Sequence, residues 1–226
     1  MSALRQPAYV PTPCEPRTSC DCELARVFQT APAAPHSPFA SGQALFRQGD
    51  PARQVFRIQS GAVVSYSLLA DGRRQVTGFH LPGGFLGLEA GVVHGTTAEA
   101  LTRVEAQALD RADLAVRAAT DNALARSLWQ ASVGAFQRSE DHALILARQG
   151  ATERVAAFLL DFSDRLGGAD IVDLPMTRQD IADYLGLTIH TVSRTLSQLQ
   201  NAGVIEARST RHVRLLRRGR LECMRA

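Results

Sequence analysis

The chain has 226 residues, 45% of them hydrophobic, which is enough for one or two domains with a buried core. Its apolar runs are far too short to span a bilayer, and its N-terminus lacks the apolar segment of a secretion signal, so we expect a cytoplasmic protein without membrane contacts. The 25 basic residues are all arginine; from Thr177 onward there are 9 of them against 4 acidic residues, a net charge of +5, whereas the whole chain carries +3. This C-terminal excess favours a polyanionic partner, and a merely solvated basic surface is the alternative.

Three of the four cysteines, Cys14, Cys20 and Cys22, lie close together in a proline-rich N-terminal segment, residues 1–24. We expect this segment to be flexible, because it has little apolar patterning. In a cytosolic protein a cysteine cluster indicates metal or redox chemistry more often than disulfide bonds. The three residues are therefore candidate metal or redox ligands, while the simpler interpretation is an exposed group that binds nothing.

Short runs rich in β-branched and aromatic residues dominate the next region, residues 25–109. Glycine-containing turns recur between them every 11 or 12 residues, a spacing typical of a β-sandwich or β-barrel. Asp71-Gly72 is a strong signal for a hairpin turn, because both positions can adopt positive φ. The predicted strands lie within Val55–Gln59, Ala62–Leu69, Gln75–Leu81 and Ala98–Leu109.

The hydrophobic period changes toward 3.6 residues over residues 110–149, which predicts a long helix. Its apolar residues form two stripes, so one can cover the strands and the other can pair with a partner helix. One stripe consists of Leu124, Leu128, Ala131, Ala135 and Leu146, and the other contains Trp129, Val133, Phe136 and Leu144. We expect the first stripe to form a homodimer interface, because its small alanines suit close helix approach; burial of the whole helix within one chain is the alternative.

The C-terminal region, residues 150–226, carries the most informative pattern. Thr177 and Asp180 fit an N-cap and its acidic partner three residues later, Gly186 fits a left-handed turn, and Thr188 fits a second N-cap. Two short helices with a glycine-containing turn and apolar residues on their facing sides predict a helix-turn-helix. The helices are expected over Thr152–Leu166, Arg178–Leu185 and Thr188–Asn201, and a wing hairpin is expected from Val204–Arg208 and His212–Leu216.

A helix-turn-helix that enters the major groove reads bases with the early, outward residues of its second helix. The candidate base contacts are Ile189, His190, Ser193 and Arg194, of which Arg194 can pair bidentately with guanine. The candidate phosphate contacts are Thr177, Arg178, Gln179, Thr188, Thr191, Ser197, Arg208, Arg211 and Arg214. For each wing arginine, a solvated charge is an equally good interpretation.

Two stretches, SLLADGRRQVTGFHLPGGFLG (Ser67–Gly87) and LPMTRQDIADYLGLTIHTVSRTLSQL (Leu174–Leu199), resemble the Crp/Fnr family of bacterial transcription regulators, and the likeness extends from about Pro35 to the C-terminus. The resemblance implies an α+β fold: an N-terminal β-roll of the jelly-roll type, a long dimerisation helix and a C-terminal winged helix-turn-helix. The FixK/FNR-like subgroup is most similar, and it implies an activator of low-oxygen respiration or nitrogen-fixation genes that binds a TTGAT-like palindrome as a dimer. The family's polymerase-facing loop corresponds here to Leu69, Asp71, Gly72 and Arg73.

The sequence departs from the family at its reading and sensing positions. FNR-like recognition helices have the pattern E-x-x-S-R, and here His190 replaces the glutamate. No arginine lies between Gly83 and Thr102, so a cyclic phosphate would lack its cation and we expect no cyclic nucleotide. The central cysteine of iron–sulfur members is missing from Val104–Leu109, so we expect no cluster and no other cofactor.

Three functions therefore remain open at this point. The first is a dimeric DNA-binding activator without a bound effector, which we favour. The second is a ligand-gated, redox-responsive or metal-responsive regulator that uses the β-roll or the N-terminal cysteines. The third is an interaction protein that has lost DNA binding. No motif of an enzyme active site is found, so we expect no catalytic activity.

Overall fold

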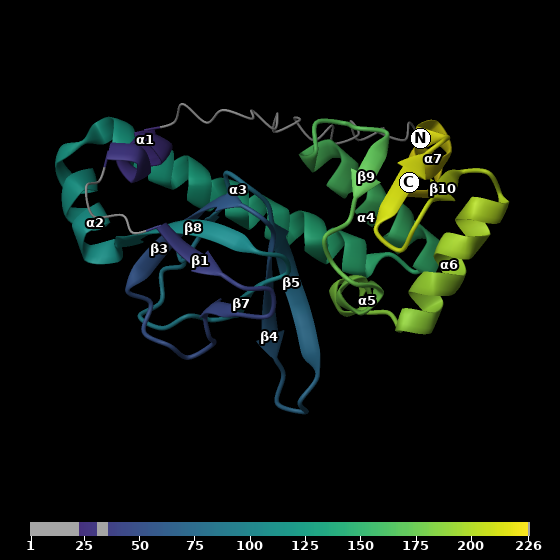
Figure 1. The fold of residues 1–226 in the computed structure, drawn as a ribbon, viewed down its shortest axis with the longest axis horizontal. Coiled ribbons are helices and arrows are strands. Elements are labelled where there is room, and N and C mark those ends of the chain that lie inside the picture. Colours follow the sequence, from purple (N-terminus) through teal and green to yellow (C-terminus); the bar gives the residue numbers. More distant parts are fainter. Residues whose placement is uncertain (1–22, 31–35, 226) are drawn as a thin grey trace, which may run out of the picture.

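The computed structural model describes residues 23–30 and 36–225, which form two domains joined along one long helix (Figure 1). The N-terminal domain is a β-roll, and the C-terminal domain is a winged helix-turn-helix, so the predicted α+β architecture is confirmed. Of the segment 1–24, only Glu23 and Leu24 are described, as the start of a helix. Cys14, Cys20 and Cys22 lie outside the described residues.

The β-roll consists of two four-stranded antiparallel sheets with the orders β1-β8-β3-β6 and β2-β7-β4-β5. Phe46, Phe56 and Ile58 lie in the core between them. The run predicted as one strand over Ala98–Leu109 is two strands, because the chain crosses from one sheet to the other after Ala100. The strands are β1 (His36–Phe39), β2 (Ala44–Phe46), β3 (Gln54–Ser60), β4 (Val63–Leu68), β5 (Arg74–His80), β6 (Phe85–Leu86), β7 (Thr97–Ala100) and β8 (Val104–Asp110).

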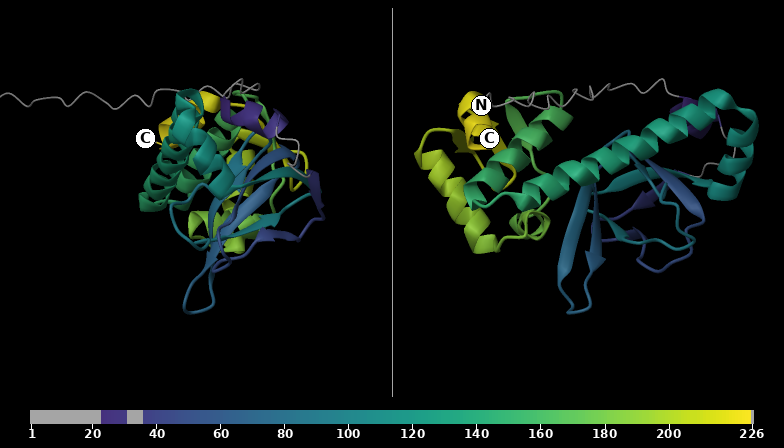
Figure 2. Two further views of the ribbon diagram at one scale, coloured as in Figure 1. Left: turned by 90° about the vertical axis from the view of Figure 1, so that its left-hand side faces the viewer. Right: turned by 180° about the vertical axis from the view of Figure 1, so that it is seen from behind.

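The region 110–149 forms two helices instead of the predicted single one: α2 (Arg111–Thr120) and α3 (Asn122–Ala147). Asp121 has an extended backbone and ends α2, and its carboxylate accepts the N–H groups of Ala123 and Leu124 at the start of α3. An aspartate favours this N-cap geometry over a helix interior, which explains the break. Helix α3 then runs along the roll and reaches the C-terminal domain (Figure 2).

Of the predicted dimer stripe of α3, Leu124 is buried inside one chain, three residues are partly buried and Ala135 is exposed. Leu124 is 1% exposed and packs with Leu24 and Phe28 of an unpredicted N-terminal helix, α1 (Glu23–Thr30). Leu128 and Ala131 pack against the same cluster. Of the other two residues of this stripe, Leu146 lies beside the turn at Gly186, and Ala135 is exposed.

The second stripe of α3 is the exposed one. Trp129, Phe136 and Leu144 are 71%, 64% and 62% exposed, although they are large and apolar. They lie seven and eight residues apart, so they follow one side of the helix. Seen from behind, α3 lies in front of the roll, and no other described helix or strand covers its outer side (Figure 2). A row of large exposed apolar side chains of this kind indicates an interaction surface.

The C-terminal domain contains the predicted helices almost residue for residue, with α4 at Ala151–Arg165, α5 at Arg178–Leu185 and α6 at Ile189–Asn201. The wing strands are β10 (Ile205–Ala207) and β11 (His212–Leu215), and an unpredicted strand, β9 (Ile171–Asp173), completes a three-stranded sheet. A short C-terminal helix, α7 (Arg218–Arg225), packs on α4. The core joins these elements to the roll, since Phe79 of β5 contacts Phe158, Phe162 and Tyr184.

His80, at the end of β5, is part of this junction. Its Nε2 forms a 2.8 Å hydrogen bond with the Ser65 hydroxyl. Burial lowers the pKa of His80 to about 3, and the charges of Arg165 and Arg138 act in the same direction. The ring is therefore neutral in the folded protein near neutral pH, whereas in the unfolded chain it takes up a proton below its ordinary pKa of about 6.5.

The unfolded state gains this proton first. The contribution of His80 to the free energy of unfolding is therefore fully present above about pH 6.5 and decreases as the pH drops toward 3. We expect the wild-type protein to lose roughly 2 kcal/mol more than the His80→Gln variant between pH 7 and pH 5. Glutamine can keep the hydrogen bond to Ser65 but does not titrate. Urea unfolding of both proteins at the two pH values measures the difference. Equal losses would mean that folded His80 binds a proton over the same pH range as the unfolded chain.

Candidate nucleic-acid interface

The capping signals of the helix-turn-helix are all present in the structure. The Thr177 hydroxyl accepts the backbone N–H of Asp180 at 3.1 Å, and the Asp180 carboxylate accepts the N–H of Thr177 at 2.8 Å, which is a complete capping box. Gly186 has φ 61°, in the left-handed region, so the chain turns sharply between α5 and α6. The Thr188 hydroxyl then accepts the N–H of Thr191 and begins α6. These local bonds fix the direction of α6.

Helix α6 is divided into a buried and an exposed face. Val192, Leu196 and Leu199 pack into the domain core, as the sequence predicts. The four candidate base contacts all point outward: Ile189, His190, Ser193 and Arg194 are exposed. Since these residues occupy the first two turns of the helix, they are the ones that a helix lying in a major groove would bring to base edges.

A groove of about 200 Å³ lies between this exposed face and the wing. Arg178 enters it from the start of α5, and Ser193 and Ser197 enter it from α6, so the structure brings three candidate contacts together. Gln200 also lines the groove and was not among the predicted residues. Its position seven residues after Ser193 places it on the same face, and this spacing could have identified it. The remaining lining residues are Leu196, Ala207 and Thr210.

Among residues 23–30 and 36–225, no carboxylate compensates the charge of Arg178 at this groove. Burial lowers the pKa of its guanidinium, and no carboxylate charge acts in the opposite direction. A half-buried cation without a counter-ion is stabilised when an anion arrives. Beside Arg178, Thr177 and Gln179 are exposed at the same helix N-terminus, where backbone N–H groups favour phosphate.

The wing arginines do not share one surface. Arg208 is exposed beside the wing turn and pairs with Glu206 at 3.3 Å. Arg214 is exposed on β11. Arg211 lines a cavity between the wing and the β-roll, whereas its neighbour Thr210 lines the α6 groove. Arg211 is exposed, and its role as a phosphate contact stays a prediction.

The hairpin between β4 and β5 carries the predicted polymerase loop and projects from the roll (Figure 1). Gly72 has φ 82°, and Leu69 accepts the N–H of Gly72 and donates its own N–H to Arg73, so the turn is tight. Hydrogen bonds from the backbone and guanidinium of Arg73 hold the pKa of Asp71 below its usual value. Leu69 is 41% exposed, so the hairpin tip presents an apolar side chain beside an ion pair.

The base of the same hairpin is attached to α5. The Arg74 guanidinium donates to Asp180 at 2.6 Å and to Asp183 at 3.3 Å, and it lies 4.2 Å from the centre of the Tyr66 ring. Burial alone would raise the pKa of Asp180, but the hydrogen bonds from Arg74 and Thr177 outweigh it and lower that pKa. One carboxylate therefore both caps α5 and binds the roll, which fixes the helix-turn-helix against the N-terminal domain.

We expect Arg74→Gln to lower the free energy of unfolding by about 1–3 kcal/mol, because Asp180 then loses its cation in a mostly buried site. Amide hydrogen exchange of α5 should accelerate, while the strands of the roll keep their protection. Arg73→Gln is the matched control, since its ion pair lies at the exposed hairpin tip and contributes little. Unchanged exchange of α5 in Arg74→Gln would show that this ion pair does not hold the helix.

The interior of the roll is closed by aromatic side chains. The rings of Phe46 and His94 stack with centroids 3.7 Å apart, Phe56 lies 5.9 Å from Phe46, and His94 Nδ1 bonds the Glu89 carboxylate.

Within residues 23–30 and 36–225 there is no group of three or more His, Cys, Asp or Glu side chains that could hold a metal ion. None of the described helices is long and apolar enough to cross a membrane.

The chain combines a β-roll with a winged helix-turn-helix, and Ser193 and Arg194 of the second helix are exposed. These features define a two-domain DNA-binding regulator. Residues 37–121 match the cyclic nucleotide-binding domain family, and residues 153–224 match the Crp-like helix-turn-helix domain family. The chain belongs to the Crp/Fnr family of transcription regulators. This family and the relatives described next are transcription regulators and not enzymes.

Three relatives illustrate the similarity. The nitrogen fixation regulation protein FixK of Rhizobium meliloti (strain 1021) is 41% identical over 179 residues, which are 79% of this chain and 82% of that protein. The structure of FixK2 from Bradyrhizobium japonicum has a TM-score of 0.81 at 42% identity and covers 85% of this chain and 98% of that one. A transcriptional regulator of the CRP family from Thermus thermophilus has a TM-score of 0.70 at 26% identity over 84% of this chain and 96% of that one.

Proposed function

We propose that this regulator binds a TTGAT-like palindrome as a homodimer and, mainly as an activator, controls genes of low-oxygen respiration or nitrogen fixation by contacting RNA polymerase. The observation that carries the proposal is the exposed reading face of α6, with Ser193 and Arg194 in the register that FNR-like recognition helices use. The likeness to FixK proteins supports the class of target genes. A regulator of bacterial promoters acts in the cytoplasm, which agrees with the expected location.

Arg194 reads guanine in this proposal, since its guanidinium can donate to O6 and N7 together. Ser193 and Ile189 contact neighbouring bases, the latter through apolar contact with a thymine methyl. The phosphate contacts surround this face: Thr177, Arg178, Gln179, Thr188, Thr191, Ser197, Arg208 and Arg214. Contacts of this second kind fix the position of the helix on the duplex without reading its sequence.

The homodimer forms through α3 in this proposal, along the stripe of Trp129, Phe136 and Leu144. A palindrome presents the same half-site twice, so two copies of α6 related by a twofold axis read it. Burying three large apolar side chains from each protomer supplies the driving force. Of the stripe predicted from the sequence, Leu128, Ala131, Ala135 and Leu146 can still border this interface, whereas Leu124 belongs to the core of its own protomer.

Polymerase contact is assigned to the β4–β5 hairpin tip: Leu69, Asp71, Gly72 and Arg73. An exposed leucine beside charged side chains suits a small transient protein interface. In a purified transcription system, Leu69→Ala is expected to reduce activation while leaving operator affinity unchanged. Reduced operator affinity in this variant would instead mean that the hairpin tip acts on DNA binding.

The side-chain chemistry of His190 leads to a specific prediction about the operator. Glutamate accepts a hydrogen bond from the cytosine amino group, whereas neutral histidine can accept with one ring nitrogen and donate with the other. We expect His190→Glu to shift the preference at one base pair of each half-site by about tenfold, with the other positions unchanged. Selection from a randomised duplex library with both proteins measures the change. The same consensus for both would show that His190 does not read a base.

This selection also tests the proposed function. The wild-type protein, purified without added small molecules, is expected to enrich two inverted TTGAT-like half-sites. Enrichment of no sequence at all by a folded dimer would contradict the effector-free activator. It would favour a regulator that needs a ligand before it binds DNA.

A further inference from the structure

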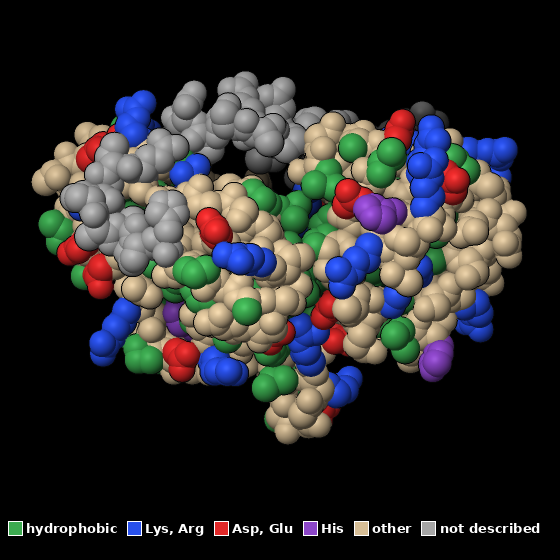
Figure 3. Space-filling model, viewed as in Figure 1, with side chains coloured by type: hydrophobic (Ala, Val, Ile, Leu, Met, Phe, Trp, Pro, Cys, Tyr) green, Lys and Arg blue, Asp and Glu red, His purple; other side chains and the backbone are tan. Residues whose placement is uncertain are grey.

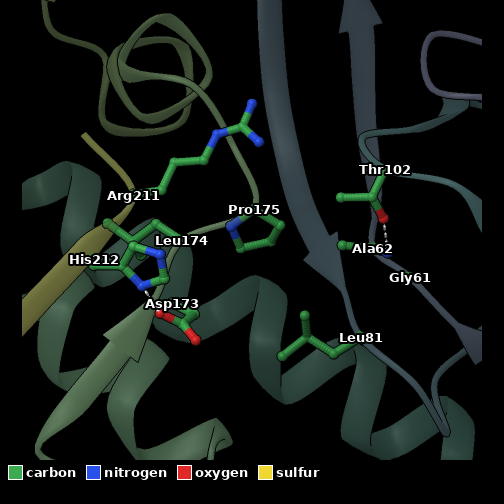
Figure 4. A pocket seen from close by; sticks show the side chains of 9 residues that line it. All are labelled: Gly61, Ala62, Leu81, Thr102, Asp173, Leu174, Pro175, Arg211 and His212. Carbon is green, nitrogen blue, oxygen red and sulfur yellow. Dashed lines mark hydrogen bonds and ion pairs between the residues drawn. The ribbon is translucent and has the colours of Figure 1, made fainter. Parts of the chain in front are cut away.

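A solvent-open cavity of about 330 Å³ lies between the β-roll and the C-terminal domain. Figure 3 shows the hollow between the two domains with hydrophobic side chains along it. The roll contributes Gly61, Ala62, Leu81 and Thr102, and the C-terminal domain contributes Asp173, Leu174, Pro175, Arg211 and His212 (Figure 4). The volume lies at the lower end of the range for small-molecule sites in proteins.

The walls of the cavity are chiefly apolar and its polar groups are mostly satisfied. Leu81 and Pro175 line the space from opposite domains (Figure 4), whereas Leu174 borders it with a side chain that is only 1% exposed. The Thr102 hydroxyl accepts the backbone N–H of Ala62 at 3.0 Å and donates to a backbone carbonyl. The Thr102 hydroxyl therefore has little unused hydrogen-bonding capacity for a polar ligand.

Arg211 is the exception. Its side chain extends from the wing toward the strands of the roll, above Pro175 (Figure 4). The carboxylate of the cavity wall, Asp173, bonds His212 Nδ1 instead. In the described part of the chain, no carboxylate lies within ion-pair distance of the Arg211 guanidinium. The backbone of Arg211 is fixed, because its carbonyl accepts the N–H of Leu174 at 2.8 Å.

We propose that this cavity binds a small organic monocarboxylate, with its hydrocarbon part between Leu81 and Pro175 and its carboxylate on Arg211. One guanidinium forms a bidentate pair with one carboxylate, which matches the single unpaired cation of the site. The other two ionisable residues of the lining, Asp173 and His212, are bonded to each other, so Arg211 is the cation left for a single carboxylate. The volume accommodates a body of about the size of one aromatic ring.

Such a ligand contacts both domains at once. It connects the β3–β4 turn and β5 of the roll with the wing, on the same junction that Arg74 and Asp180 hold. Ligand binding therefore fixes the wing relative to the roll and changes operator affinity. The effect on DNA rests on the proposed function, whereas the binding of the carboxylate does not.

The test uses the full-length protein and two probes of nearly identical shape, benzoate and the neutral benzamide. Methyl NMR with labelled leucine is expected to show benzoate binding with a dissociation constant of about 1 mM, and ligand contacts to the methyl groups of Leu81. Benzamide should bind at least tenfold more weakly. Arg211→Gln should lose the preference for benzoate, and Arg220→Gln, an exposed arginine on α7, should keep it.

Equal affinity for the two probes, equal benzoate binding by Arg211→Gln and wild type, or shifts confined to other leucines would overturn the proposal. A second measurement titrates benzoate into the operator-binding assay. We expect a change in operator affinity of at least threefold for the wild type and none for Arg211→Gln. Benzoate binding without any operator binding would contradict the proposed function but not the site; benzoate binding with unchanged operator affinity would refute the regulatory effect.

Discussion

Arg194→Ala is expected to remove sequence-specific operator binding while non-specific DNA binding persists. A bidentate arginine–guanine pair contributes about 1–3 kcal/mol of discrimination, and a dimer makes the pair twice. Operator affinity should therefore fall by roughly 30-fold to 10⁴-fold. Arg194 is exposed and its side chain packs in no core cluster, so the variant should fold normally.

The measurement is fluorescence anisotropy on the palindrome and on a scrambled duplex at one fixed salt concentration, because phosphate contacts make affinity strongly salt-dependent. Arg220→Ala serves as the control: it removes the same charge from α7, outside the reading face. The expected pattern is a large loss on the palindrome for Arg194→Ala alone. Equal losses of Arg194→Ala on both duplexes would indicate that Arg194 contacts phosphate and reads no base.

Phe136→Glu is expected to convert the dimer into a monomer. Phe136 is the middle residue of the exposed stripe of α3, with Trp129 and Leu144 on either side. In the dimer, the glutamates of both protomers would be buried without partners, at about 3–5 kcal/mol for each uncompensated charge. The dissociation constant should thus rise by at least about 10³-fold.

Sedimentation equilibrium measures the change directly, and circular dichroism confirms that the variant stays folded. Val116→Glu provides a matched control, because Val116 is a 71% exposed valine on α2, outside the stripe. Loss of the dimer should also abolish operator binding at nanomolar protein concentrations, since a single half-site supplies only part of the contacts. A Phe136→Glu protein that remains dimeric would place the interface on another surface.

The helix-turn-helix could be predicted from the sequence because its determinants are local. The bounds of α5 follow from Thr177, Asp180 and Gly186, and the start of α6 follows from Thr188, all within a few residues of the ends that they define. The exposed residues of α6 follow from the same register. Where a short segment contains its own start and stop signals, distant parts of the chain have little influence on its structure.

The assignment of the two stripes of α3 could not be predicted, since a helix with two apolar faces does not reveal which face its own chain covers. Helix α1 lies just before the roll in the sequence. That it buries Leu124 depends on tertiary packing, which the local sequence does not show. The position of the Arg211 side chain could not be predicted for the same reason, because it also depends on tertiary packing. Whether a wing arginine faces DNA or the roll depends on how the two domains dock, and that docking rests on contacts such as Arg74 with Asp180, 106 residues apart.

The claim that α6 reads a palindrome without a prior effector is tested most directly by equilibrium binding of the purified wild-type dimer. The duplexes are a TTGAT-N4-ATCAA site and a permuted site of equal length and composition, at physiological salt and with no added small molecule. We expect a dissociation constant of about 10⁻⁸ M or lower for the palindrome, and at least ~10³-fold weaker binding of the permuted site. Equal affinity for the two duplexes would contradict this claim.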